Sequence, residues 1–586
     1  MNTETKTCQN CKNQFIIEPE DFNFYKKINV PPPTWCPECR FQRRAIFRNE
    51  RKLFRGKSAL SQENILTLYP PEAGYTLYKD EEWNTDVWDP AKYGQEVDFS
   101  RPFLAQLHEL NKKVPKAHAS VLNMVNSEYS ANAAELKNCY LLFNSNHTED
   151  SAYGNAIDSC KSCVDNSHLQ KCERCYGSFW LTKCYETHFS SRCEDCNDVW
   201  FSRDCRGCSD CFGCVNLRMQ KYRIFNVQYS KEEYETKLKA MNLSTWSGFS
   251  RVSLEARSFW IQFPNKFLQG IQNTNVSGEF ITHSKNTKNS YLVREGEDLK
   301  YCQYIQVPPG KDSYDASIAG WGMDLIYEGS VCGWQGGRLK FCFECWSNAY
   351  DLEYCMFCKS SSNLFGCAGM RNKKYCILNK QYSREDYFVL REKIIAHMNV
   401  MPYKDAMGRE YRYGEFFPPE FSPFAYDQTI TPEHFPLTKE EAAAQGFRWS
   451  NPSPTEYQTT MNATDLPDAI ADISDEISKE VIKCAECGRA YRIIPQEIQF
   501  LKQNSVPAPR TCVDCRHWSR ISQRNRAKLY ARVCQCAGDT SENGIYKNTV
   551  KHSHEEGYCP NKFETSYAPE RPDIIYCEQC YNAEVV

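Results

Sequence analysis

The sequence predicts a multidomain protein, mainly β with short helices, in which four-cysteine metal modules at both ends flank a duplicated cysteine-rich β-solenoid. The first observation is length, because a chain of 586 residues is longer than a domain with a single hydrophobic core. The second is a pair of identical cysteine spacings near the two ends, and the third is a recurrence of cysteines between them. With 41% hydrophobic and 25% charged residues, most of the chain is expected to fold.

These observations divide the chain into seven expected units. They are a four-cysteine module at 1–57, a metal-less remnant of a zinc module plus linker at 58–115, solenoid halves with capping helices at 116–245 and 250–400, a proline-rich and aromatic linker at 401–480, a second four-cysteine module at 481–533, and a C-terminal zinc module at 534–586.

The two end modules have the same ligand spacing. Each has a Cys-x2-Cys pair, twenty-four intervening residues and a second Cys-x2-Cys pair, with an offset of 476 between the copies. The cysteines are Cys8, Cys11, Cys36 and Cys39 in the first copy and Cys484, Cys487, Cys512 and Cys515 in the second. Four thiolates in two short loops are the set that tetrahedral structural Zn²⁺ selects, and no open position for catalysis is implied. Free buried cysteines at this spacing, found twice, are the disfavoured alternative.

A helix is expected to begin at the second pair of each module. The segment 40–51 lacks glycine and proline, which gives a treble-clef arrangement with one pair on a turn and the other in the first helical turn. The stretch from Thr7 to Arg44 has the Cys-x2-Cys pair, aromatic and proline positions, and a Cys-Pro-x-Cys-Arg ending. With these motifs it resembles the probable zinc-ribbon (treble-clef) domain family. The resemblance implies zinc binding and no defined activity.

Both of these helices carry arginines at i, i+4 and i+8, which places them on one helical face. They are Arg40, Arg44 and Arg48 in the first copy and Arg516, Arg520 and Arg524 in the second. Residues 40–57 hold eight Lys or Arg against one acid, a density that predicts contact with a phosphate backbone. The alternative is a solvated helix face, or pairing with acidic surface elsewhere in a chain of net charge −3.

A third zinc site is expected after the second module, which gives three Zn²⁺ in total. Cys559, Cys577 and Cys580 are its expected ligands, and the spacing leaves the fourth open among Cys534, Cys536 and His554.

The early segment that aligns with this C-terminal site carries Lys79 and Glu82 in place of Cys577 and Cys580. It is therefore expected to fold without metal. Aromatic packing around Trp83 and Trp88 is expected to take over the stabilising role of the metal.

Cysteines between 118 and 226 recur at a spacing of twenty-one, as in Cys163, Cys184 and Cys205. A fixed spacing of this size is typical of a solenoid, and short apolar runs between Asn, Ser, Asp and Gly corners favour strands over helices. Cysteines in one register would form an interior ladder of small apolar side chains. Metal or iron–sulfur binding by these cysteines is the disfavoured alternative, because neighbouring coils would have to present four thiolates at one point.

The two solenoid halves end alike, and each ending is followed by a helix signal. Ser230 with Glu233 forms a capping box and Ser383 with Asp386 a close variant. Helices at these places would cover open strand edges.

The order of modules resembles large uncharacterised cysteine-rich zinc-finger proteins of bacteria, a resemblance that implies no activity. The predicted function is a non-enzymatic nucleic-acid binder, with RNA or the ribosome favoured because no base-reading helix stands out. The alternative is a protein-interaction scaffold built on the solenoid. An enzyme is least favoured, since no nucleophile motif, phosphate loop or His-Glu-x-x-His signature occurs.

The chain start and the cysteine usage predict the compartment. The first seventeen residues contain no apolar core of a signal peptide, and no run approaches the ~18 apolar residues of a membrane helix. An odd count of 33 cysteines with recurring Cys-x2-Cys pairs favours thiolate–metal chemistry in a reducing compartment. The sequence therefore predicts a cytoplasmic protein without a membrane partner.

Overall fold

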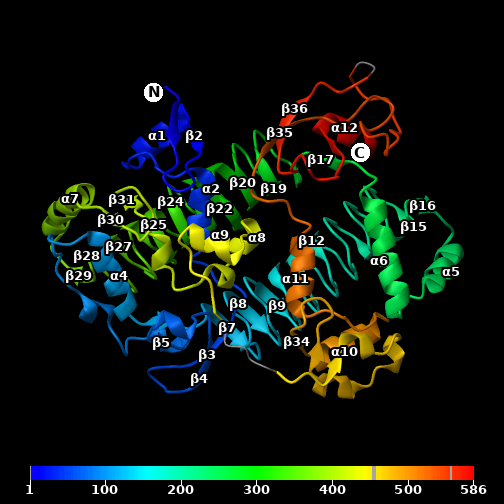
Figure 1. Ribbon diagram of the computed structural model, residues 1–586, viewed down its shortest axis with the longest axis horizontal. Coiled ribbons are helices and arrows are strands. Elements are labelled where there is room, and N and C mark those ends of the chain that lie inside the picture. Colours follow the sequence, from blue (N-terminus) through cyan, green and yellow to red (C-terminus); the bar gives the residue numbers. More distant parts are fainter. Residues whose placement is uncertain (1, 452–456, 555–556, 586) are drawn as a thin grey trace.

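The computed structural model describes residues 2–451, 457–554 and 557–585. Two parallel β arrays dominate it, with short helices and small antiparallel hairpins packed around them (Figure 1). We call residues 121–228 the first stack and residues 270–381 the second stack. Four-cysteine clusters lie near both ends of the chain.

The first stack is made of short parallel strands. They are β7 (Val121–Val125), β8 (Ala133–Lys137), β9 (Asn146–Glu149), β10 (Asn155–Asp158), β11 (Ser167–Gln170), β12 (Phe179–Thr182), β13 (Asn197–Trp200), β14 (Ser209–Phe212) and β15 (Lys221–Ile224), closed by the antiparallel β16 (Val227–Gln228).

The second stack has the same plan with some longer strands. They are β18 (Gly270–Ile271), β19 (Gly278–Thr282), β20 (Ser290–Arg294), β21 (Gly296–Lys300), β22 (Gln303–Tyr314), β23 (Ala316–Gly322), β24 (Tyr327–Gly333), β25 (Gly337–Cys345), β26 (Tyr350–Glu353), β27 (Ser362–Phe365) and β28 (Lys374–Ile377), closed by the antiparallel β29 (Lys380–Gln381).

Neighbouring strands of the first stack pair residues that are twelve apart, as in Ser167 with Phe179 and Phe179 with Ser191. The backbone takes a positive φ at every third residue, for example at Ser159, Ser162 and Asp165. One strand therefore follows the next every twelve residues, so the spacing of twenty-one seen in the cysteines is not the spacing of the strands. The buried cysteines of this stack lie at spacings that are multiples of three.

The inward positions hold cysteine, serine, threonine and asparagine together with aliphatic side chains. The Cys163 thiol donates to the carbonyl oxygens of Lys161 (3.4 Å) and Cys172 (3.6 Å). The Ser178 hydroxyl donates to the Tyr176 carbonyl oxygen (3.1 Å) and accepts the backbone N–H of Ser190 (3.1 Å). Small hydrogen-bonding side chains thus satisfy buried backbone groups at the corners.

Helices follow both stacks at the expected places. Helix α5 (Lys231–Met241) begins at Ser230, whose hydroxyl accepts the Glu233 N–H, and α7 (Arg384–Val400) begins at Ser383. Helix α6 (Trp246–Trp260) then returns along the first stack, where its Trp260 indole donates to the Phe201 carbonyl oxygen at 2.9 Å.

The two four-cysteine modules are built alike. The first contains β1 (Glu4–Thr7), β2 (Gln14–Ile17), α1 (Pro19–Lys27) and α2 (Pro37–Ala45). The second contains β33 (Ile482–Lys483), β34 (Ala490–Tyr491), α10 (Pro495–Gln503) and α11 (Val513–Ile521). Each helix of the second copy begins and ends 476 residues after its partner, so the duplication seen in the sequence extends to the helix boundaries.

Along the chain, each of these two modules is followed by a further small module. The C-terminal module has β35 (Tyr530–Val533), β36 (Lys562–Thr565), β37 (Ile575–Tyr576) and α12 (Glu578–Val585), and its N-terminal counterpart has β3 (Phe54–Lys57), β4 (Asn64–Thr67), β5 (Leu77–Tyr78) and α3 (Asp80–Trp83). Strand β5 pairs with β6 (Lys116–Ala117) at the start of the first stack, and β37 pairs with β17 (Asn265–Lys266) at the start of the second. Each stack therefore begins beside one of these modules. The module beside the first stack precedes it in the chain, whereas the module beside the second stack comes from the C-terminal end of the chain (Figure 1).

The remaining elements join these parts. They are α4 (Phe103–Lys113), β30 (Tyr403–Lys404), β31 (Glu410–Tyr411), α8 (Thr431–His434), α9 (Lys439–Ala444) and β32 (Met461–Asn462), with short 3₁₀ turns between them. The segment expected as a linker contributes Phe416 and Phe417, both fully buried, to the largest core cluster.

Lys116 occupies a closed position at the junction between the counterpart module and the first stack. Its amine donates to the carbonyl oxygens of Asn111 (2.7 Å) and Val114 (2.8 Å) and faces the rings of Tyr75 and Phe357. Burial lowers the pKa of this amine from 10.5 to about 7.

This depressed pKa gives a pH prediction. Between pH 7 and 10.5 the unfolded chain binds the proton that the folded chain releases, so stability rises with pH in that window. We expect the free energy of unfolding of the wild type to gain on the order of 2 kcal/mol over Lys116→Met between pH 7 and 9. Urea denaturation of both proteins measures this difference, and parallel pH curves would contradict it.

Candidate metal centres

Three groups of four cysteines bring their sulfur atoms within 4.8 Å of one another. They are Cys8, Cys11, Cys36 and Cys39; Cys484, Cys487, Cys512 and Cys515; and Cys534, Cys559, Cys577 and Cys580. One sulfur–sulfur distance from each group is 3.8, 3.9 and 3.9 Å, close to the tetrahedral edge of about 3.8 Å that metal–sulfur bonds of about 2.3 Å produce. A disulfide would require about 2.05 Å. Each group can therefore hold one metal ion.

The same local structure positions the ligands in all three groups. A Cys-x2-Cys pair lies at the start of α2, α11 or α12, and its first cysteine donates its backbone N–H to the sulfur of an earlier cysteine of the same group. These bonds join Cys36 to Cys8, Cys512 to Cys484 and Cys577 to Cys534, each at 3.2 Å. Backbone N–H groups at a helix N-terminus favour thiolate over thiol, which is the form that binds metal.

The thiols within a group differ in pKa. Hydrogen bonds from the Cys36 and Cys39 thiols hold the pKa of Cys8 far below its usual value. Burial opposes ionisation of Cys484, but N–H groups of Cys487 and Cys512 outweigh it and lower the pKa to about 7. One thiolate per group is thus favoured before metal binds, and the other ligands must release protons on binding.

The open choice of fourth ligand in the C-terminal module is decided by geometry. Cys534 joins Cys559, Cys577 and Cys580. Cys536 and His554, the other two candidates, belong to a neighbouring cluster that also contains His552 and Cys580. His552 was not among the ligands expected from the sequence.

The N-terminal counterpart module has a hydrogen-bonded carboxylate where the C-terminal module has thiolates. Glu82 accepts hydrogen bonds from the Ser58 and Ser61 hydroxyls and from the Lys79 backbone N–H (3.0 Å). These four residues stand where the C-terminal module has its four cysteines. In this module, a polar network therefore occupies the place of the thiolates, whose absence was already evident from the sequence.

Aromatic packing accompanies this network, as expected. Trp83 and Trp88 are buried with ring centroids 5.6 Å apart, and the Trp83 indole donates to the Pro115 carbonyl oxygen at 3.0 Å. The Arg371 guanidinium from the second stack lies over both rings.

The counterpart module offers a constructive test. In the fourfold variant Ser58→Cys, Ser61→Cys, Lys79→Cys and Glu82→Cys, we expect one additional metal ion per chain, measured by elemental mass spectrometry of the purified protein. The reason is that the backbone at these positions follows the metal-holding copy element by element. The variant carrying only the two Ser→Cys changes is the control and should gain none, while an unchanged count in a folded fourfold variant would contradict the expectation.

The arginine helices do not present a basic face to solvent. All six arginines of the predicted stripes are buried, with Arg44 fully enclosed and Arg516 9% exposed. Helix α2 lies against the second stack and α11 against the first (Figure 1). The expectation of exposed arginines for nucleic acid is therefore corrected: helical spacing predicted one face, but that face points into the protein.

The first stripe pairs with carboxylates of the second stack. Arg40 makes two hydrogen bonds to Asp315, at 3.0 and 2.9 Å. Arg44 contacts Asp315 at 3.1 Å and Glu328 at 3.5 Å, and Arg48 contacts Glu344 at 3.3 Å.

Two arginines of the second stripe contact the first stack, and the third contacts α8 and the second stack. Arg516 and Arg520 contact Asp165 at 3.2 and 2.6 Å. Arg524 contacts Glu433 of α8 at 3.3 Å and donates to the Tyr304 hydroxyl of the second stack at 2.6 Å.

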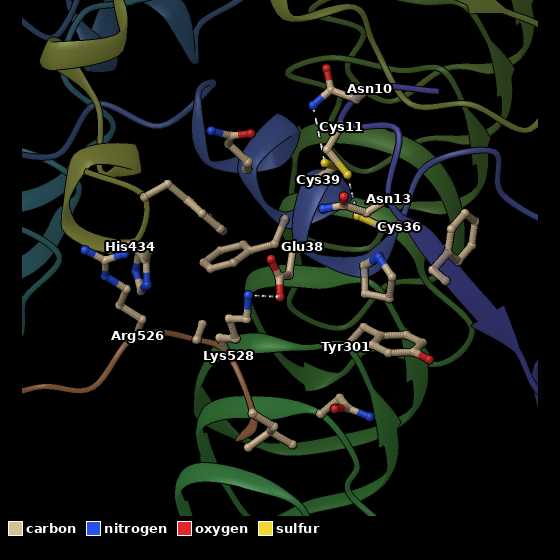
Figure 2. Close-up of a pocket in the computed structure, with 18 of the residues that line it drawn as sticks. Asn10, Cys11, Asn13, Cys36, Glu38, Cys39, Tyr301, His434, Arg526 and Lys528 are labelled. Carbon is tan, nitrogen blue, oxygen red and sulfur yellow. Dashed lines mark hydrogen bonds and ion pairs between the residues drawn. The ribbon is translucent and has the colours of Figure 1, made fainter. Parts of the chain in front are cut away.

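A cleft of about 960 Å³ adjoins the first four-cysteine group. Figure 2 shows Cys11, Cys36 and Cys39 at one side and Lys528 across from them, paired with Glu38 at 3.7 Å. The exposed Cys11 lines this cleft. The first group is therefore reachable from solvent, whereas all four cysteines of the C-terminal group are buried.

Comparisons with known proteins leave the family open. Neither a protein-family model nor a curated protein matches the chain. Among solved structures, a putative acetyltransferase from Desulfovibrio desulfuricans G20 matches over 49% of this chain and 85% of its own, with 10% identity and a TM-score of 0.10. A TM-score this low carries no argument about the fold. In the described residues, no helix combines the length and apolar character needed to cross a membrane.

Proposed function

We propose that the chain is a zinc-binding, non-enzymatic scaffold in which treble-clef modules of the zinc-ribbon type hold together two halves of a cysteine-rich β-solenoid. The observation that carries the proposal is the buried network of arginines and carboxylates between the metal helices and the stacks. The cysteine group fixes the first turn of each helix, and the helix delivers its arginines to the stack. Loss of the metal would therefore release the helix and its arginines from the stack.

Zinc is the proposed metal because of the donor set. Four thiolates per site suit a soft, tetrahedral ion, and closed sites of this kind supply folding energy to small modules. All 33 cysteines lie in the described part of the chain and none forms a disulfide, which supports a reducing compartment such as the cytoplasm.

Nucleic-acid binding, with RNA favoured, is the second candidate, and it would need a surface other than the two arginine stripes. Exposing both Arg40 and Arg44 to a phosphate backbone would remove the two arginine partners of the buried Asp315, which costs several kcal/mol. The burial of the stripes therefore favours the scaffold, whose partners would meet the outer faces of the stacks.

Hydrogen exchange on the full-length chain, with and without zinc, tests the proposal. We expect that removing zinc under reducing conditions abolishes protection in α2 and α11 and raises exchange around Asp315 and Asp165. Strands far from these helices, such as β14, should remain protected. Protection unchanged by zinc removal would exclude the metal-dependent scaffold.

RNA-binding anisotropy across a salt series on the same zinc-loaded protein separates the two candidates. We expect no salt-sensitive binding in the micromolar range. Tight binding that weakens steeply with salt would instead favour the nucleic-acid role through another surface.

A further inference from the structure

A second cluster of metal-type ligands lies beside the C-terminal four-cysteine group. Cys536, His552, His554 and Cys580 place one ligand atom each within 4.8 Å of the others. The Cys536 sulfur is 3.0 Å from His552 Nδ1 and 3.3 Å from His554 Nε2. Bonds of about 2.3 Å to sulfur and about 2.05 Å to nitrogen give a tetrahedral edge of about 3.6 Å, so these two sulfur–nitrogen pairs would need to open by only a few tenths of an ångström to hold an ion.

The surroundings of His552 match those of a metal-bound histidine. Its Nε2 faces the Glu584 carboxylate at 2.8 Å, while Nδ1 faces the cluster. When Nε2 donates its proton to the carboxylate, the lone pair on Nδ1 is available to a metal. Both side chains are almost fully buried.

The carboxylate and the sulfur are themselves held in place. Glu584 accepts hydrogen bonds from the Thr549 N–H (2.9 Å) and the Tyr546 hydroxyl (2.9 Å). Asn548 donates to the Cys536 sulfur at 3.3 Å, and the Tyr576 hydroxyl donates to Asn548 at 2.8 Å. Outer partners of this kind orient ligands and tune metal affinity.

The cluster is specific to the C-terminal copy. Cys534 and Cys559 are separated by a long segment that supplies Cys536, His552 and His554, whereas only two residues separate Ser58 and Ser61 in the N-terminal counterpart. The copy that keeps its four thiolates thus also carries the additional ligands.

The geometry points to a two-metal centre in which the Cys580 thiolate bridges two Zn²⁺ ions. Two four-coordinate ions have eight ligand positions, and seven residues fill them because Cys580 belongs to both groups. The first ion takes four sulfurs, and the second takes two sulfurs and two imidazole nitrogens. Both sites are closed, so the centre is structural and ties the segment around His552 and His554 to helix α12.

This inference rests on the proposed zinc-binding function, and counting the zinc ions separates the two. Native mass spectrometry with elemental analysis of the full-length, zinc-loaded chain should give four Zn²⁺ per chain. His552→Ala with His554→Ala should give three, as should Cys577→Ser, whereas Cys580→Ser should give two. His147→Ala, an exposed histidine of the first stack, is the control and should retain four.

Other zinc counts would overturn different parts of the proposal. Three zinc ions in the wild type, unchanged in the double histidine variant, would overturn the second ion and leave the three four-cysteine sites intact. Four in the wild type with a loss of only one in Cys580→Ser would overturn the shared sulfur. A count near zero in the wild type would overturn the proposed function itself.

Cobalt provides a readout that does not depend on removing a cysteine. Two Co²⁺ ions that share one sulfur are magnetically coupled, so the wild type should give a weaker electron paramagnetic resonance signal per bound cobalt than the double histidine variant. Equal intensity per cobalt would overturn the bridge.

Discussion

Cys36→Ser is expected to unfold the first four-cysteine module and detach α2 from the second stack. Structural zinc contributes about 10–16 kcal/mol to folding in small zinc modules, more than such a module can replace with its own core. The zinc content should fall by one ion per chain. Hydrogen exchange should show loss of protection in α2 and around Asp315, where Arg40 and Arg44 are anchored.

Cys193→Ser is the matched control, because it makes the same chemical change in a buried cysteine outside the metal groups. The Cys193 thiol donates to the carbonyl oxygens of Ser191 and Ser202, a role that the Ser178 and Ser190 hydroxyls already fill at other inward positions. We expect full zinc content and a loss of about 1 kcal/mol. If Cys36→Ser kept its zinc and its protection, the metal role of the first group would be refuted.

The second large effect is expected for Arg44→Met. The Arg44 guanidinium is fully buried and contacts Asp315, Glu328, Ser317 and Gln303. Removing it leaves carboxylates buried with fewer partners, which costs about 3–5 kcal/mol. Chemical denaturation monitored by circular dichroism measures the loss, and an unchanged zinc count separates it from loss of metal.

Arg55→Met, at an exposed arginine on β3, is the control and should change stability by less than about 0.5 kcal/mol. A comparable loss in both variants would mean that the buried network contributes nothing specific. Asp315→Asn combined with Arg44→Met should cost less than the sum of the single changes, because the two residues contact each other. Additive losses would contradict a direct interaction.

The buried network also bears on how an RNA role can be tested. Changing the six stripe arginines to glutamate would place new carboxylates beside Asp315, Glu328 and Asp165 in the protein interior. Such a protein would lose its fold before it reported on RNA. Variants of exposed basic residues are therefore the informative ones for that question.

The two duplicated cysteine groups are the part of the structure that the sequence determined by itself. A Cys-x2-Cys pair is local, so one tight turn is enough to bring its two sulfurs together, and the offset of 476 already indicated which helices correspond. The capping signals at Ser230 and Ser383 were equally local. Local chain geometry is sufficient for such features because few other conformations are compatible with them.

Only the tertiary structure decided the strand spacing, the grouping of the fourth cysteine and the position of the arginines. The cysteines predicted a recurrence of twenty-one, whereas neighbouring strands pair residues twelve apart, because that spacing depends on hydrogen bonds between strands. Cys534 lies in the group of Cys559, Cys577 and Cys580, and its sulfur accepts the Cys577 backbone N–H at 3.2 Å. Arg44 is buried against Asp315 and Glu328. These carboxylates lie far from it along the chain, so the sequence of one helix could not predict the pairing.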